Sequence, residues 1–324
     1  MVDVAEFPVA AGQQGRGSYA PVPVRGFRSR FSVGGILVEI TSDIGEDTSL
    51  GPSLETFRYT SGLPDVLITV ERALNFDWLG TPSLFDSGST WRLYESEDAL
   101  QFDFAVPAAG QIPYRRLFVD RHFSRGIVQT NVSCFEDFPQ AKNPLIYPLP
   151  ELLIMHRLSQ ERAIELHGTG IVRSNGVANL FIGHSGAGKS TTTRLWTSRE
   201  EVEVLSDDRI IVRYDDGRDG PAGPTGMRMY GTPWHGEAMF ASPNSAPLTR
   251  IFVLEHGHGN VITRLTRSQA VGELFARAFV PFHRHEYIEN ALSFLEHLAS
   301  SVPCYRYSFE PDERAVEKIQ QFHD

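Results

Sequence analysis

The sequence has few cysteines and no long apolar run, and each shortage excludes a class of protein. Cys134 and Cys304 are the two cysteines among 324 residues. Two distant thiols cannot make a disulfide framework, so we expect free thiols in a reducing compartment. No stretch of 18 apolar residues is present, and the first 20 residues lack the basic start and apolar core of a signal peptide. We therefore expect a cytoplasmic protein without a membrane-spanning segment.

Basic residues are fewer than acidic ones. The sequence has 30 Lys and Arg and 40 Asp and Glu, which gives a net charge of −10. The sequence has no cluster of Lys and Arg, and an acidic chain repels nucleic-acid phosphates. We expect no binding to nucleic acid. The content of hydrophobic residues, 41%, is ordinary for a folded protein, and the length suggests about two domains.

Composition and periodicity divide the chain into three parts. Residues 1–25 are rich in Gly, Ala, Gln and Pro without a period, which predicts a flexible tail. Residues 26–145 are predicted to form a β-rich domain with a meander-like sheet, and residues 146–324 an α/β domain. In the first domain, strands are expected within 36–40, 66–70, 91–94, 102–104, 116–119 and 127–132.

In the second domain the pattern alternates between strand and helix. Apolar spacing predicts helices over 152–166, 190–198, 266–279 and 285–300, with a last helix at the carboxyl end. Thr266 and Gln269 fit a capping box at the start of the third of these helices. Strands are expected over 170–172, 177–182, 202–205, 209–214, 251–254 and 304–309.

One motif dominates this domain. Residues 183–190, GHSGAGKS, match G-x-x-x-x-G-K-[ST] between a predicted strand and a predicted helix. Glycines let backbone N–H groups approach phosphate oxygens, the helix adds its positive end, and Lys189 can reach the β- and γ-phosphates. The Ser190 hydroxyl can ligate Mg²⁺. We expect ATP to be bound by Gly183, His184, Ser185, Gly186, Ala187, Gly188, Lys189, Ser190 and Thr191.

Two acids follow the next predicted strand. Asp207 and Asp208 end a β-like run, where carboxylates beside a phosphate loop can serve Mg²⁺ and the γ-phosphate. Successive strand residues point to opposite faces, so the two carboxylates need not share one role. The alternative is a solvated Asp-Asp turn.

These motifs resemble those of HPr kinase/phosphorylase catalytic domains. The His167-Gly168 pair, the loop 183–190 and the segment 205–209 stand in the same order and at nearly the same spacing. A wider set of HPr-kinase-like proteins also carries a Gly-Thr-Pro-Trp-x-Gly-Glu segment, here 231–237, and a strand that ends in LEHG, here 254–257. The resemblance covers roughly residues 150–310.

The resemblance implies a P-loop kinase domain of the HPr kinase/phosphoenolpyruvate-carboxykinase type, with ATP and Mg²⁺ as cofactors. It implies phosphoryl transfer to a hydroxyl, with Lys189 on the phosphates and Ser190 on the metal. Asp207 would be the general base, Asp208 a metal-side acid and His167 a neighbour of the phosphate. The family also suggests a homo-oligomer.

The sequence leaves the acceptor open. Thr191 stands where HPr kinases usually have Glu, and the family's HPr-recognition segment is absent. A protein, a peptide or a small molecule can therefore be the phosphoacceptor, and a nucleotide-gated binding module without catalysis is the remaining alternative. Glu237 is a further candidate ligand for Mg²⁺, although the segment 231–237 equally fits a tight turn around a buried Trp234.

Overall fold

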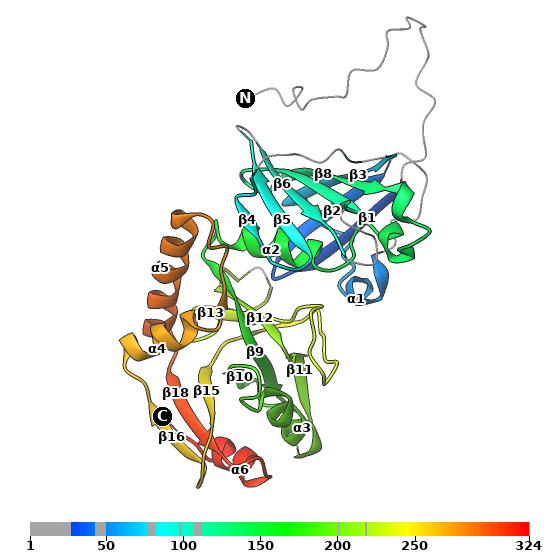
Figure 1. Ribbon diagram of the computed structural model, residues 1–324. Helices are drawn as coiled ribbons and strands as arrows, with labels where there is room; N and C mark the ends of the chain where they lie inside the picture. Colours follow the sequence, from blue (N-terminus) through cyan, green and yellow to red (C-terminus); the bar gives the residue numbers. More distant parts are fainter. Residues whose placement is uncertain are drawn as a thin grey trace, which may run out of the picture.

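The computed structural model describes residues 27–42, 50–74, 76, 82–96, 99–106, 112–199, 201–217 and 219–323. This part of the chain is mixed α/β and rich in sheet, with two large mixed sheets that lie one above the other in Figure 1. The tail predicted for residues 1–25 lies outside the described residues. Among the described helices, none combines the length and the apolar character that crossing a bilayer requires.

The first sheet has eight strands in the order β1-β2-β3-β8-β7-β6-β5-β4. The run from β8 to β4 is an antiparallel meander, as predicted, whereas β2, β3 and β8 pair in parallel. All six strands expected from the sequence are present here. The strands are β1 (Phe27–Val33), β2 (Ile36–Ser42), β3 (Val66–Ala73), β4 (Phe85–Asp86), β5 (Trp91–Glu95), β6 (Ala99–Phe104), β7 (Arg115–Asp120) and β8 (Arg125–Asn131).

A helix that follows this sheet in the chain closes its core. α2 (Leu149–Leu158) packs Leu149, Leu153 and Ile154 into the same hydrophobic cluster as the strands of the first sheet. Ile211 and Tyr230 of the second sheet reach the same cluster. The first core therefore extends beyond residue 145. Shorter elements connect these parts of the chain: α1 (Gly51–Glu55) lies between β2 and β3, and two 3-10 helices (Val132–Cys134, Pro139–Lys142) lie between β8 and α2.

The second sheet has ten strands and a parallel centre. Its main path runs β14-β13-β12-β9-β10-β15-β18-β16, and β11 and β17 also pair with β9. β10, β15 and β18 are parallel, and the other pairs are antiparallel. The strands are β9 (Ala163–Arg173), β10 (Ala178–Ile182), β11 (Val202–Ser206), β12 (Arg209–Tyr214), β13 (Met227–Tyr230), β14 (Ser245–Pro247), β15 (Arg250–His256), β16 (Val261–Arg264), β17 (Ala278–Phe279) and β18 (Cys304–Phe309).

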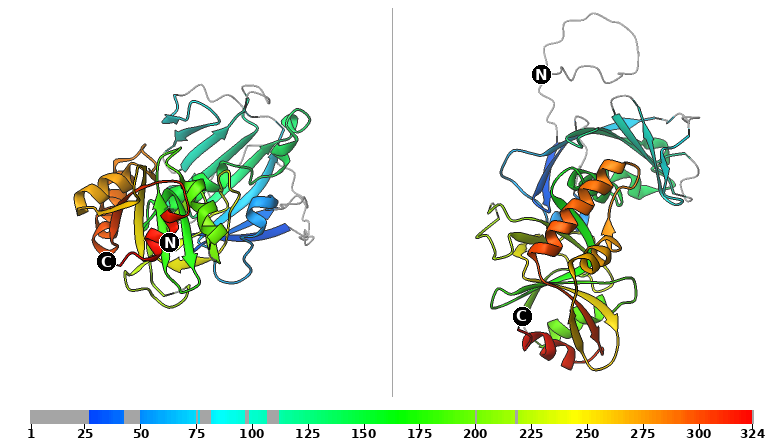
Figure 2. Two further views of the ribbon diagram at one scale, coloured as in Figure 1. Left: turned by 90° about the horizontal axis from the view of Figure 1, so that it is seen from below. Right: turned by 90° about the vertical axis from the view of Figure 1, so that its left-hand side faces the viewer.

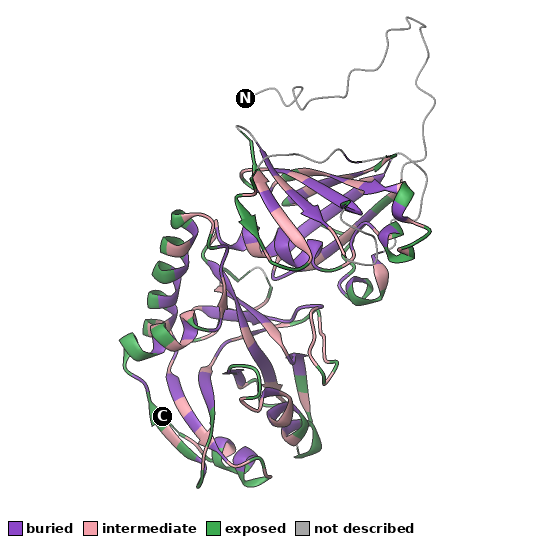
Figure 3. Ribbon diagram, in the orientation of Figure 1, coloured by how far each residue is buried: buried purple, intermediate pink, exposed green. Residues whose placement is uncertain are grey.

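Helices cover both faces of the second sheet, as two further views show (Figure 2). On one face, α3 (Lys189–Arg199) and α6 (Arg314–Gln320) pack Trp196 and Val316 against Phe181 and Phe252. On the other, α4 (Arg267–Phe275) and α5 (His285–Ser301) cover a second apolar cluster. Both sheets are largely buried, and the outward faces of α4 and α5 are exposed (Figure 3). The helices thus hold the sheet rigid beneath the loop at the end of β10.

Two predicted helices differ from the structure. The helix expected over 152–166 ends at Leu158, and residues 163–173 form β9, because this segment pairs with β10 and β12 on its two sides. The helix expected over 266–279 has the predicted capping box, but it ends at Phe275. Ala278 and Phe279 then pair with β9. In both cases pairing with a distant strand determines the local structure.

Candidate functional site

The loop between β10 and α3 has a backbone that only glycine adopts readily. Gly186 and Gly188 have φ values of 80° and 100°, in the region that L side chains avoid. A Cβ on Gly188 would lie 2.5 Å from Cζ of Phe309, so the ring of β18 closes the space beside the loop. The Thr192 N–H donates to the Gly188 carbonyl at 2.8 Å as α3 begins. The predicted loop therefore lies between a buried strand and a helix amino terminus.

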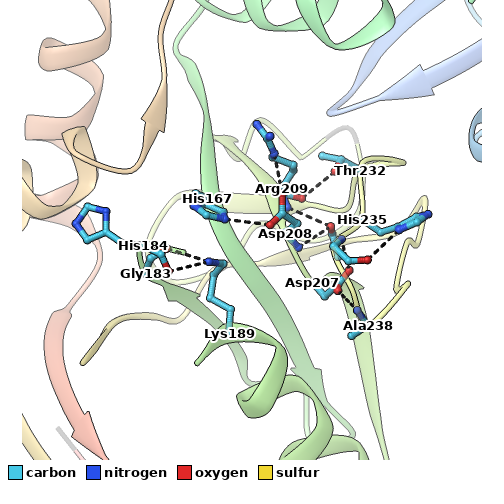
Figure 4. Close-up of polar contacts among 12 residues, drawn as sticks. His167, Gly183, His184, Lys189, Asp207, Asp208, Arg209, Thr232, His235 and Ala238 are labelled. Atoms are coloured by element: carbon cyan, nitrogen blue, oxygen red, sulfur yellow. Dashed lines mark hydrogen bonds and ion pairs between the residues drawn. The ribbon is translucent and has the colours of Figure 1, made fainter. Parts of the chain in front are cut away.

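Lys189 is buried at the start of α3, and its side chain turns back onto the loop (Figure 4). Its Nζ donates to the carbonyls of Gly183 and His184, each at 3.1 Å. Burial lowers the pKa of Lys189, and the negative charge of Asp208 opposes part of that shift. The ammonium therefore contacts the loop through these carbonyls and lies within electrostatic range of Asp208.

The central strand β9 brings the predicted motifs to one level of the sheet. The Gly183 N–H donates to the His167 carbonyl at 3.4 Å on one side, and the Gly168 N–H donates to the Asp208 carbonyl at 2.9 Å on the other. A Cβ on Gly168 would lie 2.9 Å from the Phe181 carbonyl oxygen, so this position has room for glycine alone. The histidine, the loop and the second aspartate are thus neighbours across three strands.

The side chains of His167 and Asp208 meet in this arrangement. His167 Nε2 lies 3.0 Å from Asp208 Oδ1, and Arg209 Nε donates to Asp208 Oδ2 at 2.9 Å. Burial raises the pKa of Asp208, but the hydrogen bonds and charges of His167 and Arg209 outweigh it and hold the pKa at about 2. Asp208 is therefore a carboxylate at neutral pH, about a quarter exposed.

Asp207 has a different environment. It is 1% exposed, and its carboxylate accepts the backbone N–H groups of Gly236, Ala238 and Phe240 at 2.9, 2.7 and 3.3 Å. Both oxygens are therefore bound to the loop 236–240. The structure does not place Asp207 as the predicted general base, because the carboxylate is enclosed by these donors rather than turned toward His167 (Figure 4).

The predicted Mg²⁺ ligands are only partly gathered. Ser190 is the second residue of α3, after Lys189, and the charge of Asp208 acts on Lys189, whereas Glu237 is exposed. Within the described residues no three His, Cys, Asp or Glu side chains group as a metal site. Mg²⁺ commonly keeps several waters and takes one or two carboxylates, and the hydroxyl of Ser190 and the carboxylate of Asp208 are donor types that it accepts. The remaining predicted loop residues divide into exposed His184, Ser185 and Gly186, and half-buried Ala187 and Thr191.

Three further residues join the site without having been assigned to it from the sequence. His256, in the LEHG segment, places Nε2 2.7 Å from the Gly186 carbonyl. Arg209, whose role the sequence does not indicate, pairs with Asp208 and places its Nη1 2.8 Å from Glu151 Oε1 on α2. Glu165 lies two residues before His167 on the same face of β9, where the alternation of the strand places it. Burial and the nearby Glu151 raise the pKa of Glu165 well above its usual range.

Neither the family models nor the curated proteins include a match to this chain.

Proposed function

We propose that this protein is an ATP-dependent kinase that transfers the γ-phosphoryl group to a hydroxyl of a protein, a peptide or a small molecule. The observation that carries the proposal is the Asp208 carboxylate, paired with His167 at 3.0 Å and level with the loop that joins β10 to α3. In this proposal the second sheet and its helices form a P-loop kinase domain of the HPr kinase/phosphoenolpyruvate-carboxykinase type.

The loop supplies the groups that a triphosphate needs. Its backbone N–H groups and the amino terminus of α3 favour negative charge. Lys189 now donates to two carbonyls of the loop. Phosphate oxygens are stronger acceptors than these carbonyls because they are charged, so bound ATP would draw the ammonium toward its β- and γ-phosphates. Burial keeps this contact away from water.

Ser190 and Asp208 would hold Mg²⁺, through a hydroxyl and a carboxylate oxygen. The ion would supply positive charge that offsets the charge on the transferred group. Arg209 keeps the other oxygen of Asp208 fixed at 2.9 Å. The carboxylate is thereby oriented before substrates bind.

The acceptor oxygen would attack the γ-phosphorus while the bond from phosphorus to the bridging β,γ-oxygen breaks. ADP leaves with that electron pair, and the proton of the hydroxyl passes to Asp208 and then to solvent. A carboxylate whose pKa is about 2 is a weak base. The loose transition state of phosphoryl transfer needs little proton removal before the phosphorus has moved, so orientation of the hydroxyl is the main task of Asp208. We assign Asp207 to positioning the loop 236–240.

The test uses ATP labelled on the γ-phosphate, with Mg²⁺, the purified protein and a lysate of its source organism. Asp208→Asn should bind ATP without Mg²⁺ like the wild type, bind Mg-ATP more weakly because the metal loses a carboxylate ligand, and lose label transfer by roughly 10²–10⁴-fold. Glu237→Gln, which changes an exposed carboxylate, is the matched control and should transfer at the wild-type rate. Equal transfer by Asp208→Asn would overturn the proposal. Bound Mg-ATP without any transfer would instead favour the nucleotide-gated binding module.

A further inference from the structure

A cavity of about 280 Å³ lies between the two sheets, next to the candidate site. Trp91 of β5 lines it from the first sheet, Glu151 and His156 from α2, and Arg209 and Phe282 from the second domain. Small-molecule sites begin at roughly this size. Arg209 is shared, because it lines the cavity and also holds Asp208 at 2.9 Å. The Arg209 end of the cavity therefore adjoins the carboxylate that we assign to phosphoryl transfer.

The cavity wall contains a buried acceptor without a donor. His156 is fully buried, and its Nδ1 lies 2.6 Å from the Leu152 carbonyl, which can only accept. Burial lowers the pKa of His156 to about 3, so the ring is neutral and its Nε2 carries a lone pair. Within the described part of the chain, this Nε2 has no hydrogen-bond partner, whereas Glu151 Oε1 lies 2.8 Å from Arg209 Nη1. A ligand in this cavity must therefore bring hydrogen-bond donors.

The charged side chains at this end of the cavity are grouped around Arg209. Its guanidinium contacts two carboxylates, Asp208 through Nε and Glu151 through Nη1 at 2.8 Å. Burial, and after it the nearby Glu151, raises the pKa of the third carboxyl, Glu165, well above its usual range, which favours its neutral form. His156 and His283 are neutral as well, because burial lowers the pKa of His283 to about 4. Among the residues that line the cavity, Glu151 is therefore the carboxylate that an amine would approach, beside the lone pair of His156 Nε2.

The rim is aromatic and open to solvent. Phe282 is 59% exposed and Tyr147 is 57% exposed, although both line the cavity. The rings of Phe85 and Trp91, which also line the cavity, stack with their centroids 5.0 Å apart. Exposed aromatic side chains grouped around one opening indicate a surface that an apolar group covers. Aromatic faces also attract cations.

We infer that this cavity binds the phosphoryl acceptor, and that the acceptor is a small amino alcohol with an aromatic or similarly bulky apolar body. The apolar body would lie among the rim aromatics, with the amine at Glu151 and His156. The hydroxyl would lie at the Arg209 end, toward Asp208. Since a single guanidinium spans Glu151 and Asp208, an amine and a hydroxyl on neighbouring carbons match their separation. This inference rests on the proposed kinase activity.

Binding is tested without nucleotide, by calorimetry with a matched series. The probe is phenylalaninol, which has an aromatic ring, an amine and a primary hydroxyl. 3-Phenyl-1-propanol lacks the amine. Phenylalanine keeps the amine but has a carboxylate where phenylalaninol has its hydroxymethyl group. The wild type should bind phenylalaninol at least about tenfold more tightly than either analogue, since a charge-assisted hydrogen bond is worth about that much. Absence of this preference overturns the inference.

Two variants locate the site. Glu151→Gln should weaken phenylalaninol binding about tenfold and leave 3-phenyl-1-propanol unchanged. Phe282→Ala changes an exposed side chain, should fold normally, and should weaken both ligands. Glu296→Gln, an exposed acid on α5, is the control and should bind like the wild type. Wild-type binding by both cavity variants would place the ligand elsewhere and overturn the inference.

Transfer to the bound probe is then followed with γ-labelled ATP and Mg²⁺. Labelled phenylalaninol phosphate supports the acceptor assignment. If the protein phosphorylates material in a lysate but never the bound probe, the acceptor assignment is overturned. It is also overturned if a blocked Phe-Ser peptide binds and phenylalaninol does not, because that result would favour a peptide as the acceptor. Failure to bind Mg-ATP would overturn the kinase proposal instead, and the calorimetric result would still decide the chemistry of the cavity.

Discussion

Asp207 and Asp208 are consecutive residues whose carboxylates have no partner in common. Asp207 binds the backbone of Gly236, Ala238 and Phe240, and Asp208 pairs with His167 and Arg209. The chain turns between β11 and β12 at this point, and both strands pair along β9. One carboxylate therefore holds the neighbouring loop in place, and the other joins His167 of β9 to Arg209 of β12.

Replacement of Asp207 should affect stability first. In Asp207→Asn, the amide group would direct its own N–H donors at backbone donors of the loop 236–240, which leaves buried donors unpaired. We expect a loss of about 2–4 kcal/mol in the free energy of unfolding, the usual scale for buried charge-assisted hydrogen bonds. Urea denaturation measures it. The Glu237→Gln control should stay within about 0.5 kcal/mol of the wild type, as exposed substitutions do. A stable Asp207→Asn protein that lost only transfer would restore Asp207 as the base.

The sequence predicted much of the fold where the signal is local. Alternating apolar residues located the strands of the meander, and the motif 183–190 located β10, the loop and α3. It misassigned 163–166, because Ile164 and Leu166 fit a helical spacing and also the inward face of a strand. Pairing with β12 decides between the two, and this pairing joins residues more than 40 positions apart.

The candidate site was predictable in its residue types and less so in their roles. His167, Lys189 and Asp208 were all identified from motifs, and β9 does bring them together. Which aspartate faces the site depends on the bend after Ser206, which no local pattern encodes. The cavity has no sequence signal either, because Trp91, Glu151 and Arg209 reach it from three separate segments.

Gly188→Ala should disable the loop. The substitution combines a φ of 100° with a Cβ only 2.5 Å from Phe309, so strain of about 1–2 kcal/mol adds to overpacking of about 1–3 kcal/mol. We expect Mg-ATP affinity to fall at least about tenfold, measured by calorimetry. Gly176→Ala is the matched control, with a φ of 82° and open space around the added Cβ. Equal affinity in the two variants would show that Phe309 does not constrain the loop.

The His167–Asp208 pair should make stability sensitive to acid. The pKa of Asp208 in the folded protein, about 2, lies below the unfolded value, so its pairing stabilises the protein above pH ~4. The contribution is about 2 kcal/mol at neutral pH, of which about half disappears by pH 3 and the rest at lower pH. Urea unfolding of the wild type and Asp208→Asn should converge accordingly between pH 6 and pH 3. Parallel curves would contradict the pairing, and Glu237→Gln should follow the wild type throughout.

Glu165 should produce the opposite dependence. Both of its oxygens are buried, without a hydrogen-bond partner among the described residues, and burial raises its pKa well above the usual range. The neutral form is favoured on folding, so the contribution of Glu165 is fully present below pH ~4 and is lost as the pH rises toward the folded pKa.

Glu165→Gln has nearly the same shape and cannot ionise. Its stability relative to the wild type should therefore increase from pH 4 to pH 8, by about 1.4 kcal/mol for each unit of pKa shift within that interval. Urea midpoints measure the difference, with exposed Glu296→Gln as the control. A difference that stays constant with pH would show that Glu165 is ionised in the folded protein, and Arg209 would then balance three carboxylates.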